Sequence, residues 1–216
     1  MCRRFWLPQL QPDFETYFKN TFGFDLNIPS EIDRRSKGFT PFNDIPVFFN
    51  DGNQVTVRSM YWCLVPASAP EFKPNRTWFN TRADSFNKGY QANRLKYNRC
   101  LILTSRFYEK RWEFKLKHDK QMFLGGIYDV WGDNRYSCSI ITVPANSVVG
   151  RVHDRMPYII SEYRVSEWLK RDKADISYMS FHPYGANDMI GKREDNQIEL
   201  ELEQEKLPLP NLKSPH

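Results

Sequence analysis

Cys2 is the residue of this chain whose position offers the most distinctive chemistry. Initiator methionines are commonly removed when the next side chain is small, and removal of Met1 would leave Cys2 with a free α-amine beside its thiol. Such a 1,2-aminothiol reacts with an aldehyde: the amine forms a Schiff base, and the sulfur then closes a thiazolidine ring. With Met1 retained, this ring cannot close. The plain alternative is that Cys2 is an incidental second residue with no chemical role.

Three later segments contain groups that could assist such a nucleophile. Asn80 and Arg82 lie two residues apart, so an extended segment would place both on one face, as an orienting amide and a phosphate clamp. Glu109 follows a β-rich run and is expected at a strand end, as a general acid or base. His153, two residues before Arg155, suits proton transfer near neutral pH. Each residue also has a purely structural alternative. Asn80 could cap a turn, Glu109 could form a surface ion pair, and His153 could be a structural histidine with satisfied hydrogen bonds.

The elements that must position these residues are mostly short strands. Runs of β-forming residues predict strands near residues 55–60, 100–104, 122–130 and 137–143. Spaced apolar residues predict helices from Asp13 to about Phe22 and over residues 162–170. Residues 29–46 are punctuated by Pro and Asn and are expected to be loop. We predict an α+β fold, a single domain built on a largely antiparallel, barrel-like β-sheet with a few short flanking helices.

The last part of the chain differs in charge. Six of the 26 acidic residues lie at or after position 194. Alternation around Leu200 predicts a strand with one acidic face near a sheet edge, followed by an extended tail. We therefore expect a main domain over residues 1–193. The acidic strand and tail of residues 194–216 would belong to the same domain up to about residue 207.

The amino-acid composition favours some classes of binding partner over others. The chain has 216 residues, 15% of them aromatic, and a formal net charge of +5. Cations and flat rings together favour single-stranded nucleic acid. The four cysteines have no C-x-x-C spacing, which argues against zinc and disulfides, so no metal is expected. The sequence has no apolar run long enough to predict a membrane span, and it lacks the apolar segment of a signal peptide. A cytoplasmic protein is expected, nucleoid-associated if bacterial.

Taken together and in order, the segments resemble the SOS response-associated peptidase (SRAP) family of abasic-site-processing proteins. The matching segments are MCRRF at residues 1–5, YWCLVP at 61–66, NTRAD at 80–84, RCLI at 99–102, FYE at 107–109, GIY at 126–128 with Trp131, IIT at 140–142 with Ala145 and Asn146, and HDRMP at 153–157. No single segment is decisive, but the ordered set is specific.

The resemblance implies a covalent chemistry. Family members bind single-stranded DNA that carries an abasic site and cross-link to its aldehyde through the terminal cysteine, which shields the lesion. Cys2 would be the nucleophile, and Asn80 would hold the ring-forming amine and the sugar. Glu109 would move protons during Schiff-base formation and assist removal of Met1. His153 would act as acid or base on the sugar hydroxyl and in ring opening. Lyase and autopeptidase activities are also implied, with no cofactor.

The resemblance also implies a DNA-binding surface on a monomer. Arg4, Arg82 and Arg155 would grip the phosphates that flank the lesion, and Trp62 would stack a neighbouring base.

This chain departs from the family pattern at several positions around these residues. Arg3, Cys63 and Arg106 stand where the family favours glycine. Lys110 stands where the family has tryptophan, which removes an expected stacking surface, and Trp112 is a candidate substitute. The catalytic set is retained while its surroundings have changed, so substrate preference is less well defined than chemistry.

Two other functions compete with covalent capture of DNA. Cys2 could serve a thiol autopeptidase or N-terminal-nucleophile hydrolase that has no DNA substrate, with its own amine or His153 as base. A non-covalent single-stranded DNA-binding module would use the basic and aromatic surface without Cys2.

Overall fold

A five-stranded mixed barrel forms the centre of the computed structural model, which describes residues 2–74, 78–86, 90–170, 181–195 and 199–200. Its strands are β4 (Asp44–Asn50), β5 (Val55–Trp62), β7 (Arg99–Thr104), β10 (Met122–Trp131) and β11 (Arg135–Pro144). Antiparallel pairing runs in the order β5, β4, β7, β10 and β11. Parallel pairing of β11 with β5 closes the ring. A closed ring leaves no free sheet edge among these strands.

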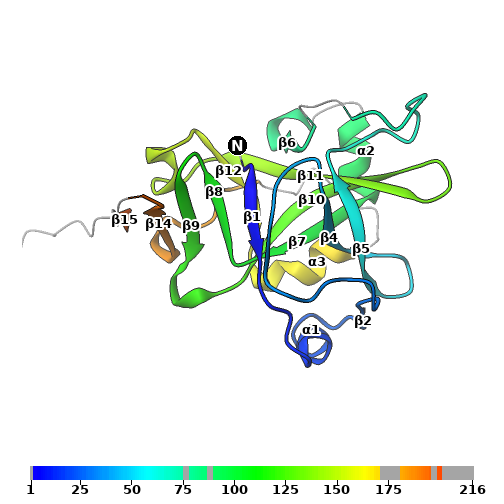
Figure 1. The fold of residues 1–216 in the computed structure, drawn as a ribbon, viewed down its shortest axis with the longest axis horizontal. Helices are drawn as coiled ribbons and strands as arrows, with labels where there is room; N and C mark the ends of the chain where they lie inside the picture. Colours follow the sequence, from blue (N-terminus) through cyan, green and yellow to red (C-terminus); the bar gives the residue numbers. More distant parts are fainter. Residues whose placement is uncertain (1, 75–77, 87–89, 171–180, 196–198, 201–216) are drawn as a thin grey trace, which may run out of the picture.

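Four short strands extend the barrel. They are β2 (Leu26–Asn27) on β5, β6 (Asn80–Arg82) and β12 (Arg155–Pro157) on β11, and β13 (Ile159–Ile160) on β10. The strands β6 and β12 both pair with residues 140–144 of β11, although their first residues, Asn80 and Arg155, are 75 positions apart in the chain. This shared partner brings two distant segments to one end of the barrel (Figure 1).

An antiparallel second sheet packs beside the barrel. In order it contains β3 (Lys37–Phe39), β1 (Arg4–Leu7), β8 (Arg106–Glu109), β9 (Trp112–Leu116), β14 (Met189–Arg193) and β15 (Glu199–Leu200). The start of the chain therefore lies inside a sheet rather than at its edge, because β1 pairs with β3 on one side and β8 on the other. That pairing fixes the position of the residues that precede β1.

Three α-helices cover the strands within the described residues. They are α1 (Phe14–Phe22), α2 (Tyr90–Tyr97) and α3 (Val165–Leu169). The helix α1 buries Phe14, Phe18 and Phe22 on one face and ends at Gly23, whose φ of +78° suits glycine. Short 3-10 helices are η1 (Ala83–Ser85), η2 (Lys117–Asp119), η3 (Val149–Arg151), η4 (Glu162–Arg164) and η6 (Ala186–Asp188). None of the helices in these ranges is long and apolar enough to cross a bilayer.

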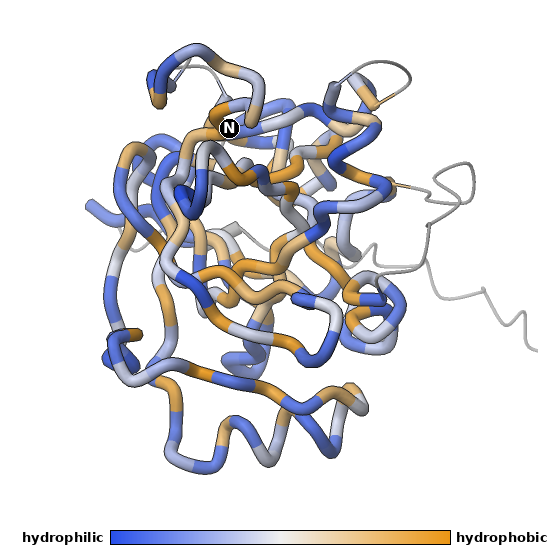
Figure 2. The backbone as a smooth tube through the Cα atoms, turned by 90° about the vertical axis from the view of Figure 1, so that its right-hand side faces the viewer, coloured by the Kyte–Doolittle hydropathy of each residue, from blue (hydrophilic) through white to orange (hydrophobic). Residues whose placement is uncertain are grey.

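The core occupies the barrel and the space between it and the second sheet. All six residues of β7 and the first eight of β10 are buried, so both faces of these strands are covered. Hydrophobic segments accordingly gather in the middle of the molecule, and hydrophilic ones form the periphery (Figure 2).

The predicted fold class is confirmed, and most predicted elements are present. The helix from Asp13 to Phe22 is α1, and the predicted helix over residues 162–170 is η4 followed by α3. The loop expected over residues 29–46 is wrong in part. It contains β3 and the start of β4, because pairing with β1 and β5 overrides the Pro and Asn punctuation outside residues 40–43. Of the predicted acidic strand, β15 lies within the described residues, and the remainder lies outside them.

Candidate active site

Four segments converge at the end of the molecule where β1 starts. Cys2 precedes β1, and Glu109 is the last residue of β8, the neighbour of β1 in the second sheet. Asn80 begins β6, and His153 lies two residues before β12, on the barrel side. The start of β1, β6 and β12 lie at this same end (Figure 1). The site therefore spans the junction of the two sheets.

Cys2 is held by Asn80. The Asn80 side-chain Nδ2 donates a hydrogen bond to the backbone carbonyl of Cys2 at 2.9 Å. Both residues are buried, with 1% and 7% of their surfaces exposed. The second polar atom of the amide, Asn80 Oδ1, is also buried and accepts no hydrogen bond within the described part of the chain. The amide thus has one end fixed on Cys2 and one acceptor to spare.

The Cys2 thiol is a weak acid in this setting. Burial raises its pKa to about 12, and the negative charge of Glu109 contributes in the same direction. The Sγ atom lies 3.8 Å from the backbone oxygen of Arg4, to which the thiol donates. At neutral pH the sulfur is therefore protonated, and a base must take its proton before or during attack.

Glu109 and His153 face each other across the site. Glu109 Oε1 lies 4.0 Å from His153 Nε2, and Glu109 is 7% exposed. The backbone N–H of Arg155 donates to His153 Nδ1 at 3.0 Å, so the neutral ring keeps its proton on Nε2, toward Glu109. Asp154 Oδ1 lies 2.8 Å from Nδ1. A carboxylate and an imidazole therefore lie next to each other in the site.

Lys110 connects the two segments that carry these groups. It lies in the turn between β8 and β9 with a φ of +54°, and its Nζ donates to the backbone carbonyl of Val152 at 2.8 Å. This contact ties the end of β8 to the loop that carries His153. The lysine therefore occupies, as a structural clamp, the place where the family pattern has tryptophan.

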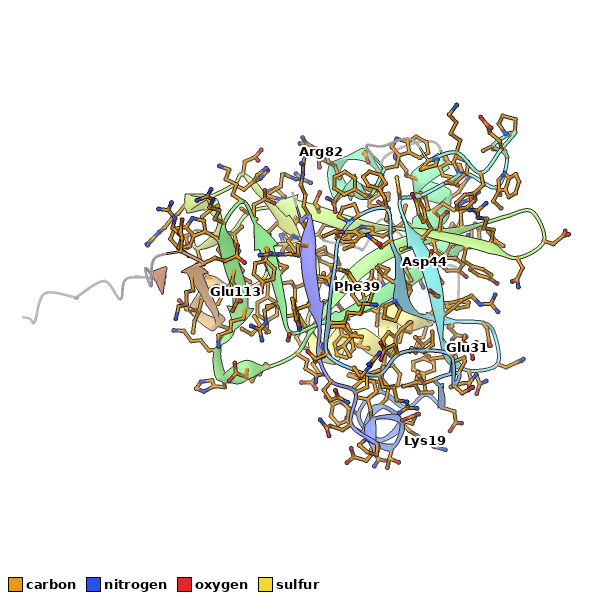
Figure 3. The ribbon with its side chains drawn as sticks, viewed as in Figure 1. Lys19, Glu31, Phe39, Asp44, Arg82 and Glu113 are labelled. Carbon is orange, nitrogen blue, oxygen red and sulfur yellow. The ribbon has the colours of Figure 1, made fainter. Side chains whose placement is uncertain are left out.

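Arg82 and Arg155 share one carboxylate. Arg82 Nη2 lies 2.7 Å from Asp84 Oδ2, and Arg155 Nη2 lies 2.9 Å from Asp84 Oδ1. Hydrogen bonds from Arg82, together with the charge of Arg155, lower the pKa of Asp84 to about 2. The Arg82 side chain is 57% exposed and extends at the end of the molecule where β1 starts, whereas that of Arg155 is 6% exposed (Figure 3). Arg82 is the accessible member of the pair.

Arg4 is also paired internally. Its guanidinium forms an ion pair with Glu194 and lies 3.7 Å from the centroid of the Tyr108 ring. The side chain is 38% exposed. The three arginines expected to grip phosphates therefore all contact a carboxylate of the chain itself.

The burial of Trp62 is at odds with the expected stacking of a base on its ring. Trp62 has 0% of its surface exposed, and its indole N–H donates to the backbone oxygen of Phe79 at 2.8 Å. Its ring packs against Phe5, with 5.2 Å between centroids. Period-2 alternation in β5 places Trp62 on the same inward face as Met60, which is the signal that sequence reasoning left unused. We therefore correct this assignment: Trp62 belongs to the core beneath the site.

The remaining departures from the family pattern have structural roles as well. Cys63 is buried, so its thiol lies in the core. Arg106 forms an ion pair with Glu113 at 3.2 Å. Trp112 is partly buried opposite Glu109 in the β8–β9 ladder. Within the described residues, no group of three or more His, Cys, Asp or Glu side chains is arranged to hold a metal ion.

A buried second-position cysteine therefore lies on a closed barrel, where an amide holds it and where a carboxylate and an imidazole lie close by. Residues 1–194 match the family described as SOS response associated peptidase (SRAP). The chain belongs to this family.

Proteins that are similar in sequence to this chain are named abasic site processing proteins. The abasic site processing protein YoqW of Bacillus subtilis (strain 168) is 30% identical over 205 residues, which cover 88% of this chain and 90% of YoqW. The abasic site processing protein HMCES of Xenopus tropicalis is 25% identical over 158 residues, covering 55% of this chain and 46% of HMCES.

Solved structures support the fold. A protein from Bacteroides thetaiotaomicron has a TM-score of 0.71 at 20% identity, with 89% of this chain and 91% of that chain covered. A protein from Bordetella bronchiseptica has a TM-score of 0.67 at 15% identity, with 88% and 98% covered.

Proposed function

We propose that this protein captures abasic sites in single-stranded DNA by a covalent thiazolidine link to Cys2, formed after removal of Met1. The observation that carries the proposal is the convergence of Cys2, Asn80, Glu109 and His153 from four separate segments. The names of the relatives support a role in abasic site processing. The adduct would shield the lesion from strand breakage.

The first step uses the α-amine of Cys2. Its nitrogen attacks the aldehyde carbon of the open-chain deoxyribose, and loss of water leaves a Schiff base. Asn80 supports this step, because its Nδ2 already fixes the Cys2 carbonyl and its unused Oδ1 can accept a hydrogen bond from the amine. The amide would thereby orient the nitrogen lone pair toward the sugar.

The second step closes the ring. The Cys2 sulfur forms a bond to the imine carbon, the C=N π electrons move to nitrogen, and the thiol proton is transferred to that nitrogen. With a thiol pKa of about 12, this transfer needs a base, and Glu109 is the nearby carboxylate. His153 would act as acid or base on the sugar hydroxyl and, in the reverse direction, assist ring opening. Aldehyde plus aminothiol gives thiazolidine plus water, so no oxidant or cofactor is needed.

Ring closure determines the fate of the DNA strand. A Schiff base at an abasic site can undergo β-elimination, which is a lyase reaction, or hydrolyse. A sulfur held next to the imine carbon competes with both reactions because it attacks intramolecularly. Phosphates would be held by Arg82, with Arg4 and Arg155 engaged as they exchange Glu194 and Asp84 for DNA.

Denaturing electrophoresis with matched oligonucleotides tests the proposal. Protein that has lost Met1, as verified by intact mass, should form a heat-stable adduct with abasic single-stranded DNA and none with the intact oligonucleotide. Cys2→Ala should abolish the adduct, and Glu109→Gln should slow it by about 100-fold or more, the range of general acid–base catalysis. Cys63→Ala, which changes a buried core thiol, is the matched control and should cross-link normally.

The alternatives give different outcomes in the same experiment. Reversible binding to both oligonucleotides without an adduct would favour a binding module. No interaction with DNA would refute capture and leave the autopeptidase. Wild-type cross-linking by Glu109→Gln would remove Glu109 from the mechanism.

A further inference from the structure

Phe42 exposes a large apolar ring close to the candidate active site. Its surface is 42% exposed, which makes it one of four large hydrophobic residues with such exposure in the described residues. It lies in the turn of residues 40–43 between β3 and β4. An exposed phenylalanine loses the hydrophobic stabilisation that burial would give it, so its position calls for a reason.

The backbone of Phe42 is strained. Its φ is +70°, in the left-handed region that bulky side chains rarely adopt. Glycine or asparagine would occupy the same turn more easily. Phenylalanine is therefore unfavourable at this position in two respects: its ring is exposed, and its backbone is in the left-handed region.

Hydrogen bonds hold the strained turn rigidly on the end of β5. The Phe42 N–H donates to the carbonyl of Trp62 at 3.1 Å, and the Trp62 N–H donates to the carbonyl of Asn43 at 2.9 Å. The Asn43 side chain donates to Thr40 Oγ1 at 3.0 Å across the turn. The backbone that carries the ring is thus held in place, which lowers the entropy lost when a ligand binds.

A short series of contacts connects Phe42 to the reactive cysteine. The Phe42 ring meets the Phe79 ring edge to face, with 5.9 Å between centroids. Phe79 precedes Asn80, which holds Cys2, and the guanidinium carbon of Arg3 lies 6.0 Å from the Phe79 centroid. An exposed ring and an exposed cation therefore flank Phe79 beside the nucleophile.

We propose that Phe42 is the base-stacking residue of this site and receives the nucleobase next to the abasic nucleotide. An abasic site deprives its neighbouring base of one stacking partner, so an apolar ring fixed beside the gap can replace that partner. Arg3 supplies a positive charge toward the adjoining phosphate. The ring takes over the role that the buried Trp62 cannot fill. This inference rests on the proposed capture of single-stranded DNA.

Binding to abasic oligonucleotides tests the stacking role directly. A 2-aminopurine base is placed on the 5′ or the 3′ side of the abasic nucleotide, and fluorescence is followed with Cys2→Ala protein to keep binding reversible. Stacking on Phe42 should quench the probe on one side. Phe42→Leu should abolish the quench and weaken binding about 10-fold, within the range measured for loss of one stacked base. Tyr17→Leu, with the same 42% exposure on α1, is the control and should bind normally.

A second variant separates stacking from a structural role. Phe42→Asn suits the left-handed backbone, so it should keep or raise the melting temperature while losing the quench and the affinity. Wild-type affinity and quench in both variants would overturn the assignment of Phe42 and leave the proposed function intact. Failure of the wild-type chain to bind or cross-link would instead refute the proposed function and this inference with it.

Discussion

Protonation of the Cys2 sulfur sets the order of events at the residue scale. Its pKa of about 12 leaves very little thiolate near neutrality, so the thiol cannot lead the reaction. In the proposed capture, the α-amine would therefore attack first, once removal of Met1 has freed it. The thiol would follow in a step assisted by Glu109. Burial would then suppress reactions of the thiol with other electrophiles and leave the intramolecular step accessible.

The thiols give a prediction for pH dependence. All four cysteines are buried, and burial raises the pKa of Cys2 to about 12 and of Cys63 to about 11, with Cys100 and Cys138 also raised. A raised pKa keeps each thiol protonated up to that value. We expect the native protein to react slowly with a disulfide reagent at pH 7.5, all four thiols to react in denaturant, and the native rate to keep rising above pH 9. A fast thiol near pH 7 that disappears in Cys2→Ser would contradict this expectation.

Residue identity indicated which side chains lie together in the site better than it indicated which of them are exposed. The sequence indicated Cys2, Glu109 and His153, and the structure places them together. The stacking role predicted for Trp62 is contradicted by its burial: alternation in β5 places Trp62 on the same face as Met60, and closure of the barrel puts that face inside. Phe42 was not anticipated, because a turn residue gives no sign of a positive φ unless it is glycine or asparagine.

At the scale of elements, the turn between β8 and β9 connects the segments that carry Glu109 and His153. Glu109 is fixed by the strand ladder, whereas His153 lies in a loop between η3 and β12. The contact from Lys110 to Val152 bridges them. The loop is also held by backbone hydrogen bonds, from His153 N–H to Val149 O at 3.0 Å and from Ala145 N–H to Asp154 O at 2.9 Å.

Lys110→Met tests this coupling, because methionine keeps an unbranched chain and removes the donor. Loss of one charge-assisted hydrogen bond of about 1–1.5 kcal/mol should slow cross-linking about 5- to 10-fold. The melting temperature should change little, since the contact is at the surface. Arg111→Met, which removes the neighbouring cation that pairs with Asp195, should leave the rate unchanged. Equal rates for both variants and the wild type would exclude the clamp.

Closure of the barrel organises the whole molecule. The pairing of β11 with β5 and β10 leaves the last residues of β11 to β6 on one edge and β12 on the other, both pairing at Thr142, and these strands deliver Asn80 and the segment after His153. The individual strands were predictable from alternation, but closure joins residues far apart in sequence. Only the resemblance to a family, rather than the local pattern, pointed to the assembled site.

Gly126 in β10 provides a test of barrel packing. A Cβ there would lie 2.9 Å from both Cys100 Sγ and Ile102 Cδ1, and 3.0 Å from the backbone oxygen of Ser139. Gly126→Ala should therefore lower the free energy of unfolding by about 1–3 kcal/mol, as overpacked cores do. Urea denaturation measures the change. Gly150→Ala, whose Cβ would have no neighbour closer than 4.0 Å, should be near neutral, and equal stability of both variants would refute tight closure at this strand.

Arg4 pairs internally with Glu194, and Arg82 and Arg155 pair with Asp84. The proposed DNA binding through these arginines would therefore be an exchange of anions. An unpaired arginine that binds a DNA phosphate releases counterions from the DNA, and the entropy of the released ions favours binding. Here the arriving phosphates would also free two carboxylates, Glu194 and Asp84, which gather cations of their own. The ions taken up offset part of those released, so the affinity should respond to ionic strength less steeply than three arginines would suggest.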